Sequence, residues 1–107
     1  MQRLITILTT IPDKKTAQLI ANKLLQNKLA ACVQISGPIE SHYTWNNKKE
    51  ISKEYQCTIK TQSHLYKKIE ALISANHPYE TPQIIGIPIL NISQNYADWI
   101  RKETTIS

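Results

Sequence analysis

The sequence predicts an α+β fold of the βαββαβ type, in which two helices cover one face of a four-stranded antiparallel sheet. Three observations predict it: two apolar patterns with helical spacing, two long segments with period-two alternation around an asparagine-rich turn, and β-branched runs near both ends. With right-handed crossovers, this order gives the ferredoxin-like arrangement. The length of 107 residues fits one domain over residues 1–107.

The first predicted strand covers Arg3 to Thr10, where leucine and isoleucine lie among threonines. Pro12 breaks this strand, and Asp13 is a candidate N-cap for the helix that follows. The next apolar residues have the i, i+3, i+4, i+7, i+8 spacing of one helix face, and the helix should end near residue 27 or 28. These residues are Ala17, Ile20, Ala21, Leu24 and Leu25.

A long β-hairpin is predicted in the middle of the chain. Most apolar side chains there occupy odd positions, over residues 31–45 and again over residues 51–61, with an interruption at Gly37-Pro38. The segment between the two runs is rich in asparagine, which is typical of a turn. Each strand has about 14 residues and, at roughly 3.3 Å per residue, spans about 45 Å.

The register of this hairpin is predicted from the need to keep apolar side chains on one face. A two-residue loop at Asn46-Asn47 would pair odd positions with even ones and split the apolar set between two faces. A three-residue loop, with Trp45 opposite Lys49, is therefore expected, unless a bulge at Gly37-Pro38 resets the count.

A second helix follows the hairpin. Ser63 is its expected N-cap, and His77-Pro78 should end it, because proline disfavours helical backbone in the preceding residue. Its apolar face is formed by Leu65, Ile69, Leu72 and Ile73.

The last predicted elements are a strand and a short helix. Gln83 to Leu90 is isoleucine-rich and reads as a buried strand, in which Pro88 indicates one free side or a bulge. Tyr96, Trp99 and Ile100 have helical spacing, and the two aromatic residues are expected to pack this helix against the domain. Its candidate N-caps are Ser93 and Asn95.

The composition limits the class of protein. The net charge of +5 is mildly basic, but the lysines are scattered and show no aromatic-interleaved patch, so nucleic-acid binding is not expected. No run is long enough to span a membrane, and the first residues lack the features of a secretory signal, so we expect a soluble, cytoplasmic protein. Cys32 and Cys57 are expected opposite Gln62 and Gly37, too far apart for a disulfide.

The hairpin predicts an oligomer. A compact domain of this length has a diameter of about 34 Å, so strands of about 45 Å extend beyond the body that should cover them. The tip, with Tyr43, Trp45 and Ile51, would then be an apolar patch in water with open strand edges. Association with further copies would cover it, whereas a hairpin bent at Gly37-Pro38 could instead fold back on its own body.

Several short motifs, in their order and spacing, resemble the CutA family of divalent-cation tolerance proteins. They are Leu29-Ala30-Ala31-Cys32-Val33, Ser41-His42-Tyr43-Thr44-Trp45, Glu54, Ile59-Lys60-Thr61, His77-Pro78-Tyr79-Glu80-Thr81-Pro82, Tyr96 and Trp99. The resemblance covers the chain from Thr9 to about Ile100, and only the whole set is specific. It implies a homotrimer with a ferredoxin-like fold that takes part in tolerance of, or response to, divalent cations, chiefly copper.

The resemblance also implies a ligand cleft between subunits. Trp45, Glu54, Lys60, Tyr79 and Glu80 would line it, and a metal ion or a small molecule would be the ligand. The alternative for Glu54 and Lys60, which share the even face of their strand, is a solvated position or a rim salt bridge that contributes little.

His77 is the best candidate for a metal ligand. It lies at a helix end beside a proline and near Glu80, and an imidazole with a carboxylate suits copper or zinc. Alternatively, His77 caps the helix or makes a hydrogen bond in a pocket. Some family members carry a copper-binding cysteine where this chain has Thr9, and a hydroxyl is a poor ligand for soft copper.

These residues favour a binding protein over an enzyme. An acylphosphatase-like hydrolase would need a glycine-rich phosphate loop with an arginine, yet the two glycines, Gly37 and Gly86, both lie in strand patterns. An RNA-recognition domain would need exposed aromatic residues on central strands. Two alternatives stay open: a small-effector sensor like the PII signalling proteins, which share the fold, and an assembly or anchoring protein without metal chemistry.

Overall fold

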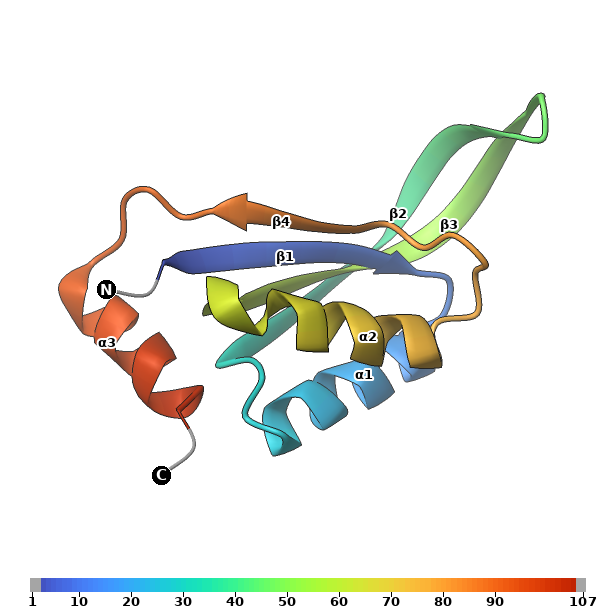
Figure 1. The fold of residues 1–107 in the computed structure, drawn as a ribbon. Helices are drawn as coiled ribbons and strands as arrows, with labels where there is room; N and C mark the ends of the chain where they lie inside the picture. The colour runs from blue at the N-terminus through green and yellow to red at the C-terminus, as the bar shows by residue number, and fades with distance from the viewer. Residues whose placement is uncertain (1–2, 106–107) are drawn as a thin grey trace.

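The computed structural model describes residues 3–105. Along the chain the elements are β1 (Leu4–Ile11), α1 (Lys14–Gln26), β2 (Cys32–Trp45), β3 (Lys48–Gln62), a 3₁₀ turn (Ser63–Leu65), α2 (Tyr66–Asn76), β4 (Ile84–Pro88) and α3 (Gln94–Glu103). This is the predicted βαββαβ order with a terminal helix, and it confirms the fold class (Figure 1).

The four strands form one antiparallel sheet in the order β2-β3-β1-β4, and α1 and α2 cover one of its faces (Figure 1). Apolar side chains from both layers are fully buried between them, which confirms the faces predicted from the 3.6-residue spacing. Leu25 is the exception, since it lies exposed at the border of the helix face. The fully buried set includes Ile7, Ile11, Ile20, Leu24, Ile59, Ile69 and Ile73.

The helix ends follow the sequence signals in part. Asp13 caps α1 as predicted, since its carboxylate accepts hydrogen bonds from the backbone N–H of Thr16 (2.8 Å) and from the Thr16 hydroxyl (2.9 Å). The prediction that Ser63 caps the second helix is wrong. Ser63 begins a 3₁₀ turn that precedes α2, and Leu65 is the N-cap residue of α2, without a side-chain capping bond. The helix ends at Asn76 with His77 as its C-cap, as expected.

The turn of the hairpin has two residues, so the expected three-residue loop is wrong. Trp45 pairs with Lys48, and both Asn46 (φ 51°) and Asn47 (φ 65°) adopt left-handed backbone. Asparagine tolerates this region better than most residues, and two left-handed residues give the tight turn that matches the natural twist of paired strands. The three-residue loop was expected because, in strands without a bulge, a two-residue turn would split the apolar side chains between two faces.

A β-bulge at Gly37-Pro38 resolves that conflict. Ser36 pairs with Gln56 and Ile39 pairs with Glu54, so two residues of β2 lie opposite Tyr55 alone. Odd-numbered side chains of β2 therefore point towards the helices before the bulge. After the bulge they point to the other side of the sheet. A bulge at Gly37-Pro38 is the feature that was expected to reset the register if it formed.

The same register moves the cysteines from their predicted partners. Cys57 lies opposite Ile35 and Cys32 opposite Lys60, because the shorter turn and the bulge together shift the pairing by two residues. Both thiols are free, as predicted, and burial raises the pKa of Cys57 to about 11.

The strand β4 is shorter and more exposed than predicted. It pairs only with β1, which confirms the free side indicated by Pro88. The expected burial is wrong for a single chain, in which Ile85 and Ile87 are 44% and 45% exposed. They belong to the sheet face turned away from α1 and α2, which we call the open face: Thr6, Leu8, Gln34, Gln56, Thr58, Lys60, Ile85 and Ile87.

The terminal helix α3 packs at one end of the sheet through Ala97 and Ile100, which are buried with Leu4 and Ala31. The predicted packing role of the two aromatic residues is seen in part within one chain, since the Tyr96 hydroxyl lies against the thiol of Cys32 on β2, and burial together with this contact raises the pKa of Tyr96. Tyr96 and Trp99 stack on each other, with ring centroids 5.5 Å apart, and stay more than one-third exposed.

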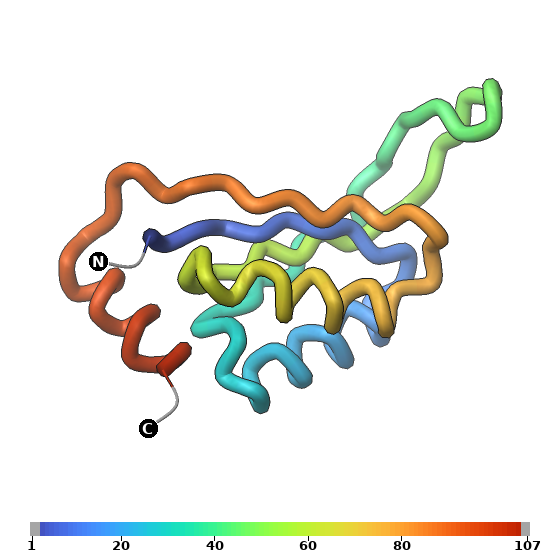
Figure 2. The backbone as a smooth tube through the Cα atoms, viewed as in Figure 1, coloured from blue at the N-terminus to red at the C-terminus, as the bar shows by residue number. Residues whose placement is uncertain are grey.

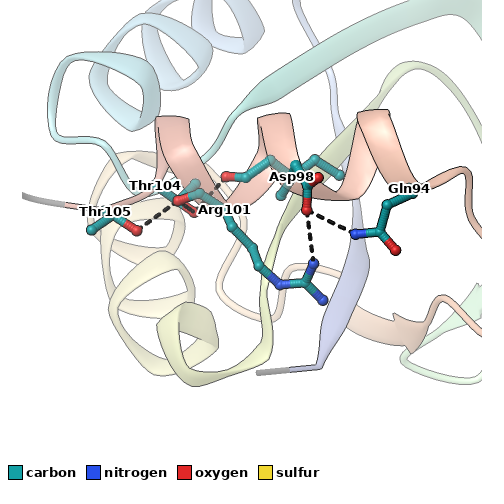
Figure 3. Close-up of polar contacts among 6 residues, drawn as sticks. Gln94, Asp98, Arg101, Thr104 and Thr105 are labelled. Carbon is teal, nitrogen blue, oxygen red and sulfur yellow. Dashed lines mark hydrogen bonds and ion pairs between the residues drawn. The ribbon is translucent and has the colours of Figure 1, made fainter. Parts of the chain in front are cut away.

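Polar contacts hold the exposed side and the end of α3 (Figure 3). Asp98 accepts a hydrogen bond from Gln94 (2.8 Å) and pairs with Arg101 (3.9 Å). The hydroxyl of Thr104 donates to the carbonyl of Ile100 (2.7 Å) and accepts from Gln62 of β3 (2.9 Å). The end of the helix is thereby tied to the sheet.

The β2–β3 hairpin projects well beyond the helices, whereas α3 lies at the other end of the molecule (Figure 2). The described chain measures 46 × 26 × 22 Å and is therefore elongated. Within residues 3–105, none of the helices has the length and apolar character needed to cross a membrane.

Candidate ligand-binding cleft

An open cleft of about 740 Å³ lies where the projecting part of the hairpin meets the loop between α2 and β4. We call it the hairpin cleft. The hairpin supplies one wall, the loop after His77 supplies the other, and the end of β1 contributes at the base. It is lined by Thr10, Ser41, His42, Tyr43, Trp45, Glu54, Pro78, Tyr79, Glu80, Thr81 and Gln83.

The β-bulge determines which side chains reach this cleft. Because directly paired residues share a sheet face, Ile39 and Glu54 point to the same side. Tyr43 and Trp45, two and three pleats further along β2, lie on that side too. Without the extra residue at the bulge, the two aromatic side chains would point to the side of the helices instead.

Glu54 is the most buried charged side chain of the cleft. It is 5% exposed, and the Tyr79 hydroxyl donates a hydrogen bond to its Oε2 at 2.9 Å. Burial, together with this carboxylate, raises the pKa of Tyr79 to about 12. Near neutral pH the phenol is therefore a stable donor, and it links the loop to the hairpin.

His77 lies behind the cleft rather than in its lining. Its Nδ1 accepts a hydrogen bond from the backbone N–H of Tyr79 (3.0 Å), and its Nε2 lies 2.7 Å from the carbonyl of Thr10. Since Nδ1 accepts, Nε2 carries the proton and donates to that carbonyl. Both ring nitrogens are thus used in hydrogen bonds that join the loop to β1. This is the arrangement expected if His77 makes a hydrogen bond in a pocket instead of binding a metal ion.

The rest of the lining is aromatic and polar. Trp45 and Tyr43 are 45% and 40% exposed, and the Tyr43 hydroxyl is held by the hydroxyl of Ser52 at 2.7 Å. The imidazole Nε2 of His42 lies 2.6 Å from a carboxylate oxygen of Glu40, which is outside the lining. The cleft therefore combines two exposed rings with two carboxylates, Glu54 and Glu80.

The structure brings together most of the residues expected at a ligand site. Trp45, Glu54, Tyr79 and Glu80 all line the hairpin cleft. Lys60 does not line it, since it lies further along β3 on the open face and donates a hydrogen bond to Gln34 (2.8 Å).

The sequence analysis missed other residues of the lining. Tyr43 could have been found, because its spacing of two from Trp45 places both rings on one face of a strand. Thr10, Thr81 and Gln83 carry no such signal, since the cleft depends on how the loop folds over β1.

The described residues of one chain do not fit a complete copper or zinc site. Among residues 3–105, no three histidine, cysteine, aspartate or glutamate side chains come close enough to hold a metal ion. The hydroxyl of Thr9 is fully buried without a hydrogen-bond partner, on the helix side of β1. His77 could ligate a metal only by giving up a backbone hydrogen bond.

Known relatives agree with the fold. Arabidopsis thaliana "Protein CutA, chloroplastic" is 36% identical over 100 residues, which are 94% of this chain and 55% of the relative. This chain thus spans about half the length of that protein. The Thermus thermophilus divalent-cation tolerance protein CutA is 35% identical over 98 residues, which are 92% of this chain and 95% of that protein.

Solved structures are equally similar. CutA1 from Oryza sativa superposes with a TM-score of 0.94 at 33% identity, covering 99% of this chain and 97% of that one. CutA1 from Shewanella sp. SIB1 gives 0.92 at 40% identity, covering 96% of both chains. Residues 5–103 also match the family model described as CutA1 divalent ion tolerance protein. The chain therefore belongs to the CutA1 divalent ion tolerance protein family.

Proposed function

We propose that this chain is a homotrimeric binding protein of divalent-cation tolerance, and that it binds a metal ion or a small molecule in the hairpin cleft, where neighbouring copies meet. One observation carries the proposal: the cleft is built on an arm of the chain that projects beyond the domain body and keeps its aromatic side chains exposed.

Exposed apolar surface supports the oligomer. In one chain Ile51 at the tip is 64% exposed and Leu90 beyond β4 is 87% exposed, and the open face adds Ile85 and Ile87. The outer edges of β2 and β4 also have no partner strand within the described chain. Soluble proteins seldom leave both apolar patches and long strand edges uncovered.

The lining supports binding of a ligand. Small-molecule sites are concave and largely apolar, with a few well-placed polar groups. The hairpin cleft has this character, with a buried carboxylate held by a phenol and flanked by aromatic rings. His77 lies outside the lining and is bonded to backbone groups at both ring nitrogens, so it has no free nitrogen for proton transfer in the cleft.

A metal site would need ligands from more than one copy. Glu54 and Glu80 are the carboxylates that one cleft offers, and a neighbouring copy would have to supply the remaining donors. This arrangement would be consistent with a family of divalent ion tolerance proteins.

A titration tests the ligand part of this proposal. Metal-free protein is titrated with Cu⁺, Cu²⁺ and Zn²⁺ by calorimetry, and a set of small metabolites is screened for a rise in Tm. At least one ligand should bind the wild type and lose most of its effect in the Glu54→Ala, Tyr79→Ala double variant.

The outcomes separate the branches. Dissociation constants weaker than about millimolar for all three metal ions would remove the metal branch and leave a sensor of small molecules. An unchanged response in the double variant would contradict the cleft as the binding site.

A further inference from the structure

The charges and rings of the hairpin cleft indicate the class of its ligand. We propose that the cleft is selective for an organic cation, an alkylammonium or guanidinium group, held between the rings of Tyr43 and Trp45 and the carboxylates of Glu54 and Glu80. This inference rests on the proposed function, because it names the ligand of the same cleft.

The lining is acidic although the protein is basic. The chain carries 13 lysines and arginines against 8 aspartates and glutamates. Nevertheless, the eleven residues of the lining include two glutamates and neither lysine nor arginine. A phosphate or carboxylate ligand would meet these two carboxylates without a strong positive partner, so the lining disfavours anions.

The buried carboxylate has no cationic partner among the described residues. Glu54 is 95% removed from solvent, and its hydrogen bond comes from the neutral Tyr79 phenol. Neither Glu54 nor Glu80 belongs to the ion pairs formed among residues 3–105. Taking a carboxylate out of water costs free energy, and a ligand cation placed against it would offset part of that cost.

Two aromatic rings lie on the same side of the hairpin as this carboxylate. The strand register places Tyr43 and Trp45 on the face of Glu54, and both residues line the cleft. The hydrogen bond between Tyr43 and Ser52 limits the movement of one ring. Ammonium and guanidinium groups bind to the faces of such rings, most strongly to tryptophan.

With the donors of one chain alone, an organic cation fits this lining better than a bare metal ion. Copper and zinc require three or four nitrogen, sulfur or oxygen ligands, and within residues 3–105 no three suitable side chains come together. Aromatic rings contribute nothing to such coordination, but they bind alkylammonium and guanidinium groups. The cleft of about 740 Å³ also has the size of a site for a small organic molecule.

Fluorescence of Trp45 can report binding in the full-length protein. The Trp99→Phe background leaves Trp45 as the only tryptophan. The probes are butylammonium, butylguanidinium, butyrate and 1-butanol, at one ionic strength, with Zn²⁺ as a separate arm. We expect the two organic cations to bind at least about tenfold more tightly than butyrate and butanol.

Charge-neutral variants locate the interaction. Glu54→Gln keeps an acceptor for Tyr79 and should weaken binding of the organic cations at least about fivefold, with butanol unaffected. Glu80→Gln, at an exposed position, should weaken it at least about threefold and serves if the buried variant is unstable. Glu103→Gln in α3 makes the same charge change away from the cleft and should have no effect.

The contrary results are distinct. Butyrate binding as tightly as butylammonium would overturn the selectivity for cations and leave the cleft as a ligand site. Zn²⁺ binding more tightly than both organic cations, with loss in Glu54→Gln, would replace the inference with a metal site. Absence of binding by every probe would overturn this inference and also count against the ligand part of the proposed function.

Discussion

At the scale of residues, the contact between Glu54 and Tyr79 is the centre of the hairpin cleft. The carboxylate comes from the hairpin and the phenol from the loop after α2, and the two side chains join at 2.9 Å. His77 supports the same loop through two hydrogen bonds to backbone groups. These three residues fix the geometry of the cleft without any ligand.

The Tyr79 phenol should make stability depend on alkaline pH. Its pKa is raised from 10.0 to about 12 in the folded protein, first by burial and then by Glu54. A raised folded-state pKa contributes stability that is present below pH 10 and lost as the pH rises from 10 towards 12. The wild type should therefore lose stability over this range more steeply than Tyr79→Phe, in urea unfolding at several pH values.

The comparison between the two proteins is decisive here because other tyrosines ionise in the same range. Equal slopes for the wild type and Tyr79→Phe between pH 10 and 12 would show that the phenol is not protected by the cleft.

Individual site residues could be predicted from the sequence where they belong to a motif of the family. Glu54, Tyr79, Glu80 and Trp45 were predicted through the family resemblance, and the structure brings them together in one cleft. Lys60 belongs to the same pattern but lies outside that cleft in one chain, because it is three pleats away from Glu54 along β3. Motifs identify such residues, but distances within a strand decide which of them meet.

At the scale of elements, the bulge in β2 decides what the hairpin presents to the cleft. Gly37 has a φ of +136°, and a Cβ atom added there would lie 2.9 Å from the carbonyl oxygen of Glu54 and 3.2 Å from the Tyr55 ring. Residues with a side chain rarely adopt this backbone conformation. The carbonyl of Glu54 cannot move far, because it belongs to a paired strand. The position therefore requires glycine.

A pair of glycine variants tests this requirement. Gly37→Ala should lower the free energy of unfolding by about 2–3 kcal/mol, from backbone strain and the contact with the carbonyl. Gly86→Ala, in β4, should change it by less than about 1 kcal/mol, because the new methyl group would meet the Tyr66 ring at an ordinary 3.4 Å. Chemical unfolding measures both, and equal losses would contradict the special role of the bulge.

The order and type of the elements could be predicted, but the hairpin register could not. Periods of 3.6 and 2 residues identified both covering helices and both long strands, since each buries one face. The register failed because a two-residue turn at Asn46-Asn47 and a bulge at Gly37-Pro38 each move the pairing, and their effects combine. The local sequence indicates both the turn and the bulge. Which turn length occurs together with the bulge depends on how the whole sheet packs.

At the scale of the whole molecule, the surface left by one chain is the main feature. The predicted burial of β4 fails in one chain because, among residues 3–105, α1 and α2 cover only the other face of the sheet. The prediction came from an apolar pattern that normally marks buried surface. In the proposed oligomer, a neighbouring copy would cover part of this surface.

Two substitutions at similarly exposed positions can show whether the open face is covered in the oligomer. Ile87 on the open face and Leu25 on α1 are 45% and 44% exposed in one chain. Ile87→Lys should shift the oligomer towards smaller species and lower the Tm, because the charge would be buried against a neighbouring copy. Leu25→Lys should leave both properties nearly unchanged. Similar effects of the two substitutions, by sedimentation velocity and calorimetry, would argue against burial of the open face.

We infer that one chain cannot cover its own hairpin and open face, and we propose that three copies share them. Light scattering after size-exclusion chromatography, at micromolar protein concentration, measures the mass directly. A homotrimer should give about 37 kDa, three times the chain mass of 12.3 kDa. A single well-folded species of about 12 kDa would contradict it, and the proposal of a cleft shared between copies would have to be abandoned.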